Sequence, residues 1–119
     1  RLHFIDFEYA GWDDPAKTVG DFFCQPAIPV PLKYFTLFVR EIAGDLPDPD
    51  IQITKFNLLF PLFQIKWCFI MLNTFLLSEA KRYRFANKSV DMEKQKKQQL
   101  EKAKKALKQI RIIEEAVFT

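Results

Sequence analysis

Two carboxylates near the start of the chain have the spacing of a metal site. Asp6 and Glu8 lie two positions apart within residues 2–9, a short apolar run rich in aromatic and β-branched residues that predicts a buried strand. Side chains two positions apart in a strand share a face, so both carboxylates can approach one metal pair. Mg²⁺ prefers hard oxygen ligands, usually one or two carboxylates together with nucleotide phosphates. The pattern predicts a magnesium site, and the alternative for Asp6 is an aspartate that caps a turn.

The other residue types that often do chemistry are scarce. His3 is the only histidine and alternates with the buried positions of the predicted strand, so we interpret it as a strand residue rather than a base. With no second histidine and no cysteine at ligand spacing, the sequence does not support a zinc site. Cys24 and Cys68 lack Cys-x-x-Cys spacing, which indicates two buried, reduced thiols.

The run Ile5-Asp6-Phe7-Glu8-Tyr9-Ala10-Gly11-x-Asp13-Asp14-Pro15 resembles the metal-binding segment of the aminoglycoside phosphotransferase and choline kinase superfamily, small-molecule relatives of protein kinases. The resemblance implies that Asp6 is the Mg²⁺ ligand that bridges ATP phosphates. It further implies that Glu8 assists as a metal ligand in the choline-kinase-like branch and that Ile5 lines the nucleotide pocket. The implied cofactors are Mg²⁺ and ATP, and the implied partner is a small molecule with an acceptor hydroxyl.

The motif covers about fifteen residues of the chain. Residues 22–24 resemble the short helix that follows it in the choline kinase branch. The family usually places an aspartate after the Asp-Pro turn, followed by an aliphatic and a small residue, whereas this chain has Thr18-Val19-Gly20 and an acid only at Asp21. The family's catalytic loop, glycine-rich loop and ATP-pairing lysine precede the metal segment. The resemblance therefore implies a C-terminal lobe fragment, inactive alone, whose catalytic residues are expected upstream of residue 1 in the missing N-terminal part of the protein.

Composition predicts one small, mainly helical domain. Hydrophobic residues make up 49% of the 119 residues and charged residues 28%, which excludes intrinsic disorder. Only 3 glycines stand beside 7 prolines and 13 phenylalanines, a balance that disfavours many-stranded barrels. We expect a mainly α fold with a short N-terminal β segment, the C-terminal lobe of a protein-kinase-like phosphotransferase. Without a signal-peptide pattern, a cytoplasmic location is expected.

Three segments should position the chemistry. Residues 1–11 are predicted to form the strand and metal-binding loop, 14–84 a helical body, and 87–117 a long basic amphipathic helix. In the body, Asp14-Pro15 predicts an N-cap and first helical residue of a helix to Cys24. Prolines 26, 29 and 31 then indicate an extended connection, and a second helix is expected over 32–43.

The apolar segment 51–84 is predicted to be the core, and Pro61 should kink it or break it into two helices. Residues 58–77 approach the length of a membrane span, but Pro61, Gln64, Lys66 and Asn73 argue against one. Trp67 is interpreted as a core aromatic. The alternative, from the family resemblance, is a position at the acceptor side of the cleft.

Positive charge is concentrated toward the end of the chain, where the last helix is predicted. Residues 81–111 have a net charge of +9, against −4 for residues 1–80. Asn87 or Ser89 is the predicted cap, residues 93–99 are expected to project into solvent, and an apolar stripe should face the body or a partner helix: Leu100, Ala103, Leu107, Ile110 and Val117. Because aromatics are not interleaved, a solvated basic face is favoured over binding of nucleic acid or anionic lipid.

These observations predict part of an ATP- and Mg²⁺-dependent kinase that transfers a γ-phosphoryl group to a small-molecule hydroxyl. The alternative is a noncatalytic helical interaction module or a degenerate kinase lobe. A third hypothesis makes the basic helix an anchor for anionic membranes or RNA. Asp45, Asp48 and Asp50 are interpreted as solvated loop charges, with a site for a cationic acceptor as the alternative.

Overall fold

The computed structural model describes residues 1–3, 11–86, 89 and 91–118, with side chains as far as residue 110. Within these residues the chain is mainly helical and contains no strand, which confirms the expected predominance of helix. Residues 1–3 have no regular structure and are exposed. Residues 4–10, which contain most of the predicted strand, lie outside the described residues.

Helix α1 (Pro15–Cys24) begins and ends where the sequence predicts. The Asp14 carboxylate accepts a hydrogen bond from the Ala16 N–H at 2.8 Å, and Pro15 occupies the first turn, where its missing N–H costs nothing. The proline-containing loop that follows is closed by the Gln25 side chain, which accepts from the Ile28 N–H at 2.9 Å and donates to the Ile28 carbonyl.

The second predicted helix is divided into a short 3₁₀ turn, η2 (Leu32–Tyr34), and α2 (Phe35–Gly44). The next helix, α3 (Pro49–Met71), runs through Pro61 without interruption. Of the two outcomes expected at Pro61, a kink or a break, the break is therefore wrong. Phe56, Phe60 and Gln64 are buried on both sides of the proline, and this burial offsets the backbone hydrogen bond that proline removes, a loss of about 3 kcal/mol.

The chain does form two helices from this segment, but the division lies further on. A 3₁₀ turn, η3 (Leu72–Phe75), and an extended Leu76 separate α3 from α4 (Leu77–Ala86). Helix α4 has no buried residue.

The last helix, α5 (Met92–Phe118), is capped differently from the prediction. Neither Asn87 nor Ser89 is the cap, because the Asp91 carboxylate accepts from the N–H groups of Glu93 and Lys94 at 3.0 and 3.3 Å. An aspartate at this position also interacts favourably with the positive end of the helix dipole.

The apolar stripe predicted for α5 is correct at Ala103 and Ile110 but wrong at Leu100 and Leu107. Met92, Ala103 and Ile110 are buried, whereas Leu100 and Leu107 are 36% and 51% exposed. The predicted projection of residues 93–99 into solvent is wrong for one face, because Gln95, Lys96 and Gln99 are half-buried. This face packs on η3, and the Lys96 ammonium lies 5.9 Å from the Phe75 ring centroid. Val117 lies beyond the described side chains.

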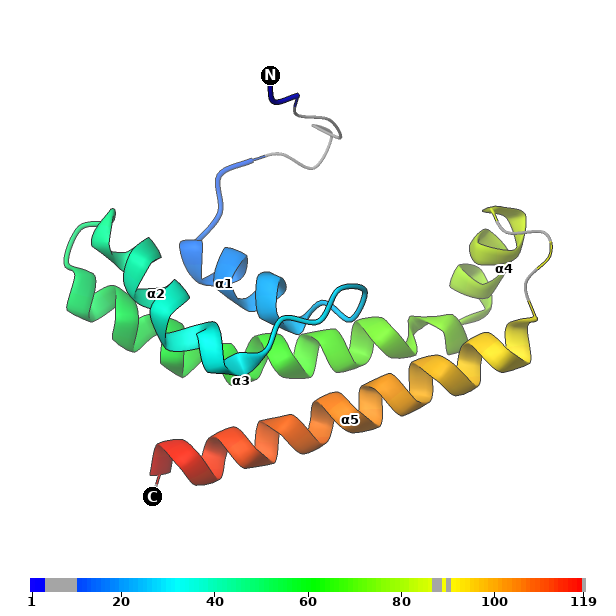
Figure 1. Ribbon diagram of the computed structural model, residues 1–119. Helices are drawn as coiled ribbons and strands as arrows, with labels where there is room; N and C mark the ends of the chain where they lie inside the picture. Colours follow the sequence, from blue (N-terminus) through cyan, green and yellow to red (C-terminus); the bar gives the residue numbers. More distant parts are fainter. Residues whose placement is uncertain (4–10, 87–88, 90, 119) are drawn as a thin grey trace.

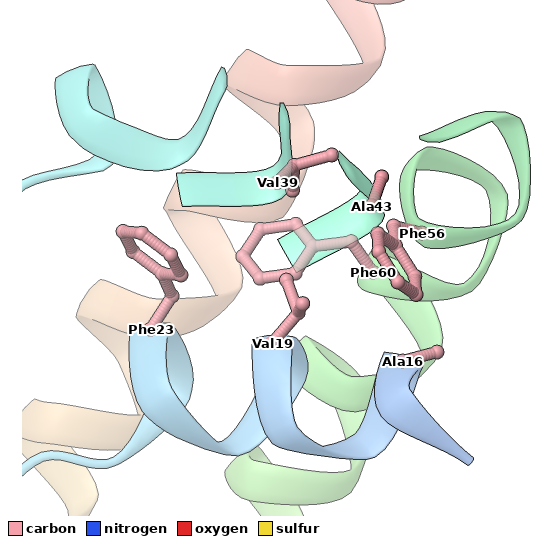
Figure 2. Packing of buried hydrophobic residues seen from close by; sticks show 7 residues of the cluster. All are labelled: Ala16, Val19, Phe23, Val39, Ala43, Phe56 and Phe60. Atoms are coloured by element: carbon pink, nitrogen blue, oxygen red, sulfur yellow. The ribbon is translucent and has the colours of Figure 1, made fainter. Parts of the chain in front are cut away.

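Helix α3 is the centre of the molecule. Figure 1 shows α1 and α2 on one side of it and α5 along another, with α4 near the start of α5. The core lies between α1, α2 and α3, where seven buried residues converge (Figure 2): Ala16, Val19, Phe23, Val39, Ala43, Phe56 and Phe60. The rings of Phe23 and Phe35 pack on Phe60 with centroids 6.4 and 4.4 Å away.

Gly20 permits the close approach of α1 to α3. A Cβ atom on Gly20 would lie 2.6 Å from Cδ2 and 2.7 Å from Cβ of Phe63, well inside van der Waals contact. A mid-helix glycine costs about 1 kcal/mol relative to alanine, so this position trades helix propensity for packing.

The opposite face of α3 has no partner in the described part of the chain. Five apolar side chains at helical spacing are between 41% and 70% exposed, a set that we call the α3 stripe: Ile51, Leu58, Leu62, Ile65 and Phe69. By length and composition alone, the span Pro49–Phe75 is apolar enough to cross a membrane, with a mean hydropathy of 1.4. Its two lysines are both paired with carboxylates of the Asp14–Asp21 segment.

Candidate functional site

The three predicted ligands of the nucleotide and metal, Ile5, Asp6 and Glu8, lie outside the described residues. After them in the chain come Gly11 and Trp12, and the side chain of Trp12 is fully exposed. The next two residues of the motif are Asp13 and Asp14, and their geometry shows what holds the end of the segment.

Both carboxylate oxygens of Asp14 make structural contacts within the protein. Its Oδ1 accepts from the Ala16 N–H, and its Oδ2 lies 2.9 Å from the Lys55 ammonium on α3. The hydrogen bond from Ala16 and then that from Lys55 lower the pKa of Asp14 below its ordinary value. Asp13 accepts from the Asp14 N–H at 2.8 Å. The motif therefore ends in a carboxylate that starts α1 and joins it to α3.

A second carboxylate, Asp21, lies further along α1 and accepts hydrogen bonds from three donors. Its Oδ1 accepts from the Trp67 indole N–H at 2.8 Å and from the Lys66 ammonium at 3.1 Å, and its Oδ2 accepts from Lys17 at 3.0 Å. Partial burial by itself raises the pKa of Asp21, and the three hydrogen bonds outweigh this effect, so the pKa lies below its ordinary value. We call Asp21, Lys17, Lys66 and Trp67 the Asp21 cluster.

Sequence reasoning did not predict the Asp21 cluster. The spacing of Lys17 and Asp21 is that of an i,i+4 ion pair, which the sequence could have indicated. The contacts to Lys66 and Trp67 join residues more than forty positions apart and depend on the packing of α1 against α3. Trp67, interpreted as a core aromatic, is half-buried and fixed through its indole N–H.

His3 and the cysteines are placed as follows. His3 is exposed and outside any strand, which corrects its interpretation as a satisfied strand residue. Cys24 and Cys68 are free thiols and half-buried rather than fully buried. Burial, and next the negative charge of Asp21, raise the pKa of the Cys24 thiol to about 12, so it stays protonated at neutral pH. No group of three or more metal-ligating side chains occurs within the described residues.

The aspartates of the loop before α3 and the lysines of α5 are largely exposed. Asp45, Asp48 and Asp50 are exposed, and most lysines of α5 are exposed too. Asp48 also adopts a left-handed backbone conformation, with φ of 52°, just before α3 begins.

Comparisons with known proteins found no relative of this chain. No family model matches the chain, and no curated protein or solved structure matches it significantly.

Proposed function

We propose that this chain is the C-terminal lobe of an ATP- and Mg²⁺-dependent kinase that transfers a γ-phosphoryl group to a hydroxyl of a small molecule. The observation that carries the proposal is the motif of residues 5–15, in which two strand-spaced carboxylates precede an Asp-Pro helix start. The Asp14 cap and the Asp14–Lys55 ion pair support it, because they attach the end of the motif to the helical body.

Hard carboxylate oxygens fit Mg²⁺, and Asp6 with Glu8 would hold it, whereas Ile5 would contact the nucleotide base. Bound Mg²⁺ would neutralise charge on the phosphates during transfer. The described residues would contribute rigidity, because Asp14 and Asp21 join α1 to α3 at two points. Positioning of this kind accounts for much of phosphoryl-transfer catalysis.

Asp6→Asn in the full-length protein tests the proposal. Turnover of ATP should fall by at least about 100-fold, the scale on which one preorganised electrostatic contact acts. Asp13→Asn is the matched control, because Asp13 lies in the same motif and, among the described residues, its carboxylate accepts only from the neighbouring backbone N–H. Wild-type turnover in the Asp6 variant would refute the metal role. Equal losses in both variants would indicate a structural effect.

The α3 stripe favours a second candidate function, a noncatalytic interaction module. Five exposed apolar side chains on one helix face are typical of a surface that another helix covers. Thermal melts of the full-length protein separate the two functions, since Mg²⁺ and ATP stabilise only a protein that binds them in the native state. A melting temperature unchanged by saturating Mg-ATP would favour the interaction module.

A further inference from the structure

Helix α4 contributes least to the packing of the molecule. None of its 10 residues is buried, and within the described part of the chain it packs mainly on η3. Figure 1 shows it at the end of α3, beside the start of α5 and away from α1 and α2. Most of this helix is therefore open to another surface.

One face of α4 carries large apolar side chains. Leu77 and Phe85 lie about two turns apart on the same face, and they are 81% and 83% exposed. Phe75 and Leu76, just before the helix, are 47% and 54% exposed. Large exposed apolar side chains gathered at one end of a molecule mark a site of interaction with another molecule or with a membrane.

The same face also carries two cations. Lys81 and Arg84 follow Leu77 at helical spacing, which places them between Leu77 and Phe85 on the helix surface. Neither makes an ion pair with a carboxylate of the described residues, whereas Arg82, further round the helix, pairs with a glutamate at 3.3 Å. We call Leu77, Lys81, Arg84 and Phe85 the α4 face.

This combination of residues selects the kind of partner. Long cationic side chains lie along apolar surface while their charged ends stay in water, so the α4 face suits the boundary between acyl chains and anionic headgroups. The α3 stripe lacks this charge, because both lysines of α3 are paired with aspartates. RNA would contact the cations of the α4 face but would leave Leu76 and Leu77 without an apolar partner. Charge and apolar surface together favour lipid.

We propose that the α4 face binds the surface of an anionic lipid bilayer. Leu77 and Phe85 enter the boundary between headgroups and acyl chains, and Lys81 and Arg84 contact lipid phosphates. The contact is peripheral and reversible, since a helix of 10 residues is about 15 Å long and too short to cross a bilayer. The proposal depends on α4 and does not require the kinase function.

Co-sedimentation of the full-length protein with vesicles measures this contact. One type of vesicle contains phosphatidylcholine alone, and the other contains phosphatidylcholine with about one third phosphatidylglycerol. The protein should bind the anionic vesicles at least about tenfold more tightly than the neutral ones. This preference should diminish as the salt concentration is raised from about 0.1 M to about 0.5 M, because salt screens the attraction.

Charge-reversal variants assign the electrostatic part of the contact to α4. Lys81→Glu/Arg84→Glu should weaken binding to the anionic vesicles by at least about tenfold, because the variant repels the phosphates. The matched control is Lys94→Glu/Lys97→Glu, which makes the same charge change at the same spacing on exposed positions of α5. This control should weaken binding much less, since screening limits the attraction to charges close to the bilayer.

A second pair of variants tests the apolar part. Leu77→Ser/Phe85→Ser should also weaken binding by at least about tenfold, because two large side chains no longer leave water on binding. The control, Ile28→Ser/Leu37→Ser, removes two large apolar side chains that are 78% and 61% exposed outside α4. It should retain the affinity of the wild type. All four double variants change exposed side chains, so the urea transition should stay cooperative.

Tryptophan fluorescence shows whether α4 enters the lipid. In a Trp12→Phe background, Phe85→Trp adds an indole on the α4 face, and Leu37→Trp adds one on α2 as the control. Trp67 contributes to both signals, so the background protein alone provides its share. Vesicles with brominated acyl chains should quench the indole added at position 85 and leave the one at position 37 unquenched.

Failure of the full-length protein to sediment with anionic vesicles at millimolar lipid would overturn the proposal, and it would mean that a protein surface covers the α4 face. Equal losses in the two charge-reversal variants would overturn it too, as would equal quenching at positions 37 and 85. Tighter binding to single-stranded RNA than to the vesicles would assign the face to nucleic acid instead. These measurements need no ATP, so this proposal and the kinase function can fail separately.

Discussion

Asp21 is the residue on which the junction of α1 and α3 depends. Asp21→Asn removes the charge that three donors share and leaves two lysines with a neutral partner. We expect a loss of about 1–2 kcal/mol in the free energy of unfolding, because the side chains are only partly buried and water screens them. Urea denaturation measures it. Asp45→Asn is the control, since Asp45 is exposed and outside the ion pairs of the described residues, and it should change stability little.

The same carboxylate predicts how stability depends on pH. The pKa of Asp21 is lower in the folded protein than its ordinary value of 3.8, so its contribution is present above that value and is lost as the pH falls through the folded pKa. Urea midpoints of the wild type should therefore decline below about pH 4 more steeply than those of Asp21→Asn. If both proteins also carry Trp12→Phe, Trp67 is the only tryptophan, and its fluorescence follows unfolding at the Asp21 cluster. Parallel declines in both proteins would contradict the role given to the cluster.

At the scale of elements, Gly20 sets the distance between α1 and α3. Gly20→Ala gains helix propensity but drives a methyl group into the Phe63 side chain, so it should destabilise the protein by about 1–3 kcal/mol. Gly44→Ala is the matched control, because a Cβ atom there meets nothing within 4 Å. It should be neutral or slightly stabilising. Chemical denaturation of both variants compares them directly, and equal effects would mean that the two helices do not pack as closely as Gly20 suggests.

Local signals predicted some elements and not others. Asp14 is a typical N-cap residue and Pro15 a typical first residue of a helix, so α1 could be predicted to the residue. Pro61 carried an equally strong local signal for a break, yet burial of Phe56 and Phe60 keeps α3 continuous, an effect of packing that no local pattern contains. The end of α3 at η3 had no strong breaker to mark it.

The candidate site also has one part that the sequence predicts and one part that it does not. The motif of residues 5–15 could be read from residue types and spacing alone. The Asp21 cluster joins residues distant in sequence, and it exists only because α1 and α3 pack together. Cap residues show a milder form of the same limit, since Asn87, Ser89 and Asp91 are all suitable types and the structure uses Asp91.

The whole molecule consists of a core of α1, α2 and α3 with α5 packed along another side of α3 (Figure 1). The contact between α5 and α3 uses small or flexible side chains. Ala103 is 6% exposed, and its carbonyl lies 3.8 Å from the Cys68 Sγ. This interface buries fewer large side chains than the core, so α5 should exchange its amide hydrogens through openings of lower free energy than those of α1 and α3.

Ala103→Asp tests the register of that contact. A carboxylate at this buried position would have to leave water, so α5 should detach while the core of α1, α2 and α3 persists. Hydrogen exchange should then show lost protection across α5 and retained protection in α1 and α3. Leu107→Asp is the matched control, with the same new side chain one turn away at a position that is 51% exposed. The stripe predicted from sequence makes both substitutions disruptive, whereas the observed register makes only Ala103→Asp so. Loss of α5 protection in both variants would contradict the observed packing.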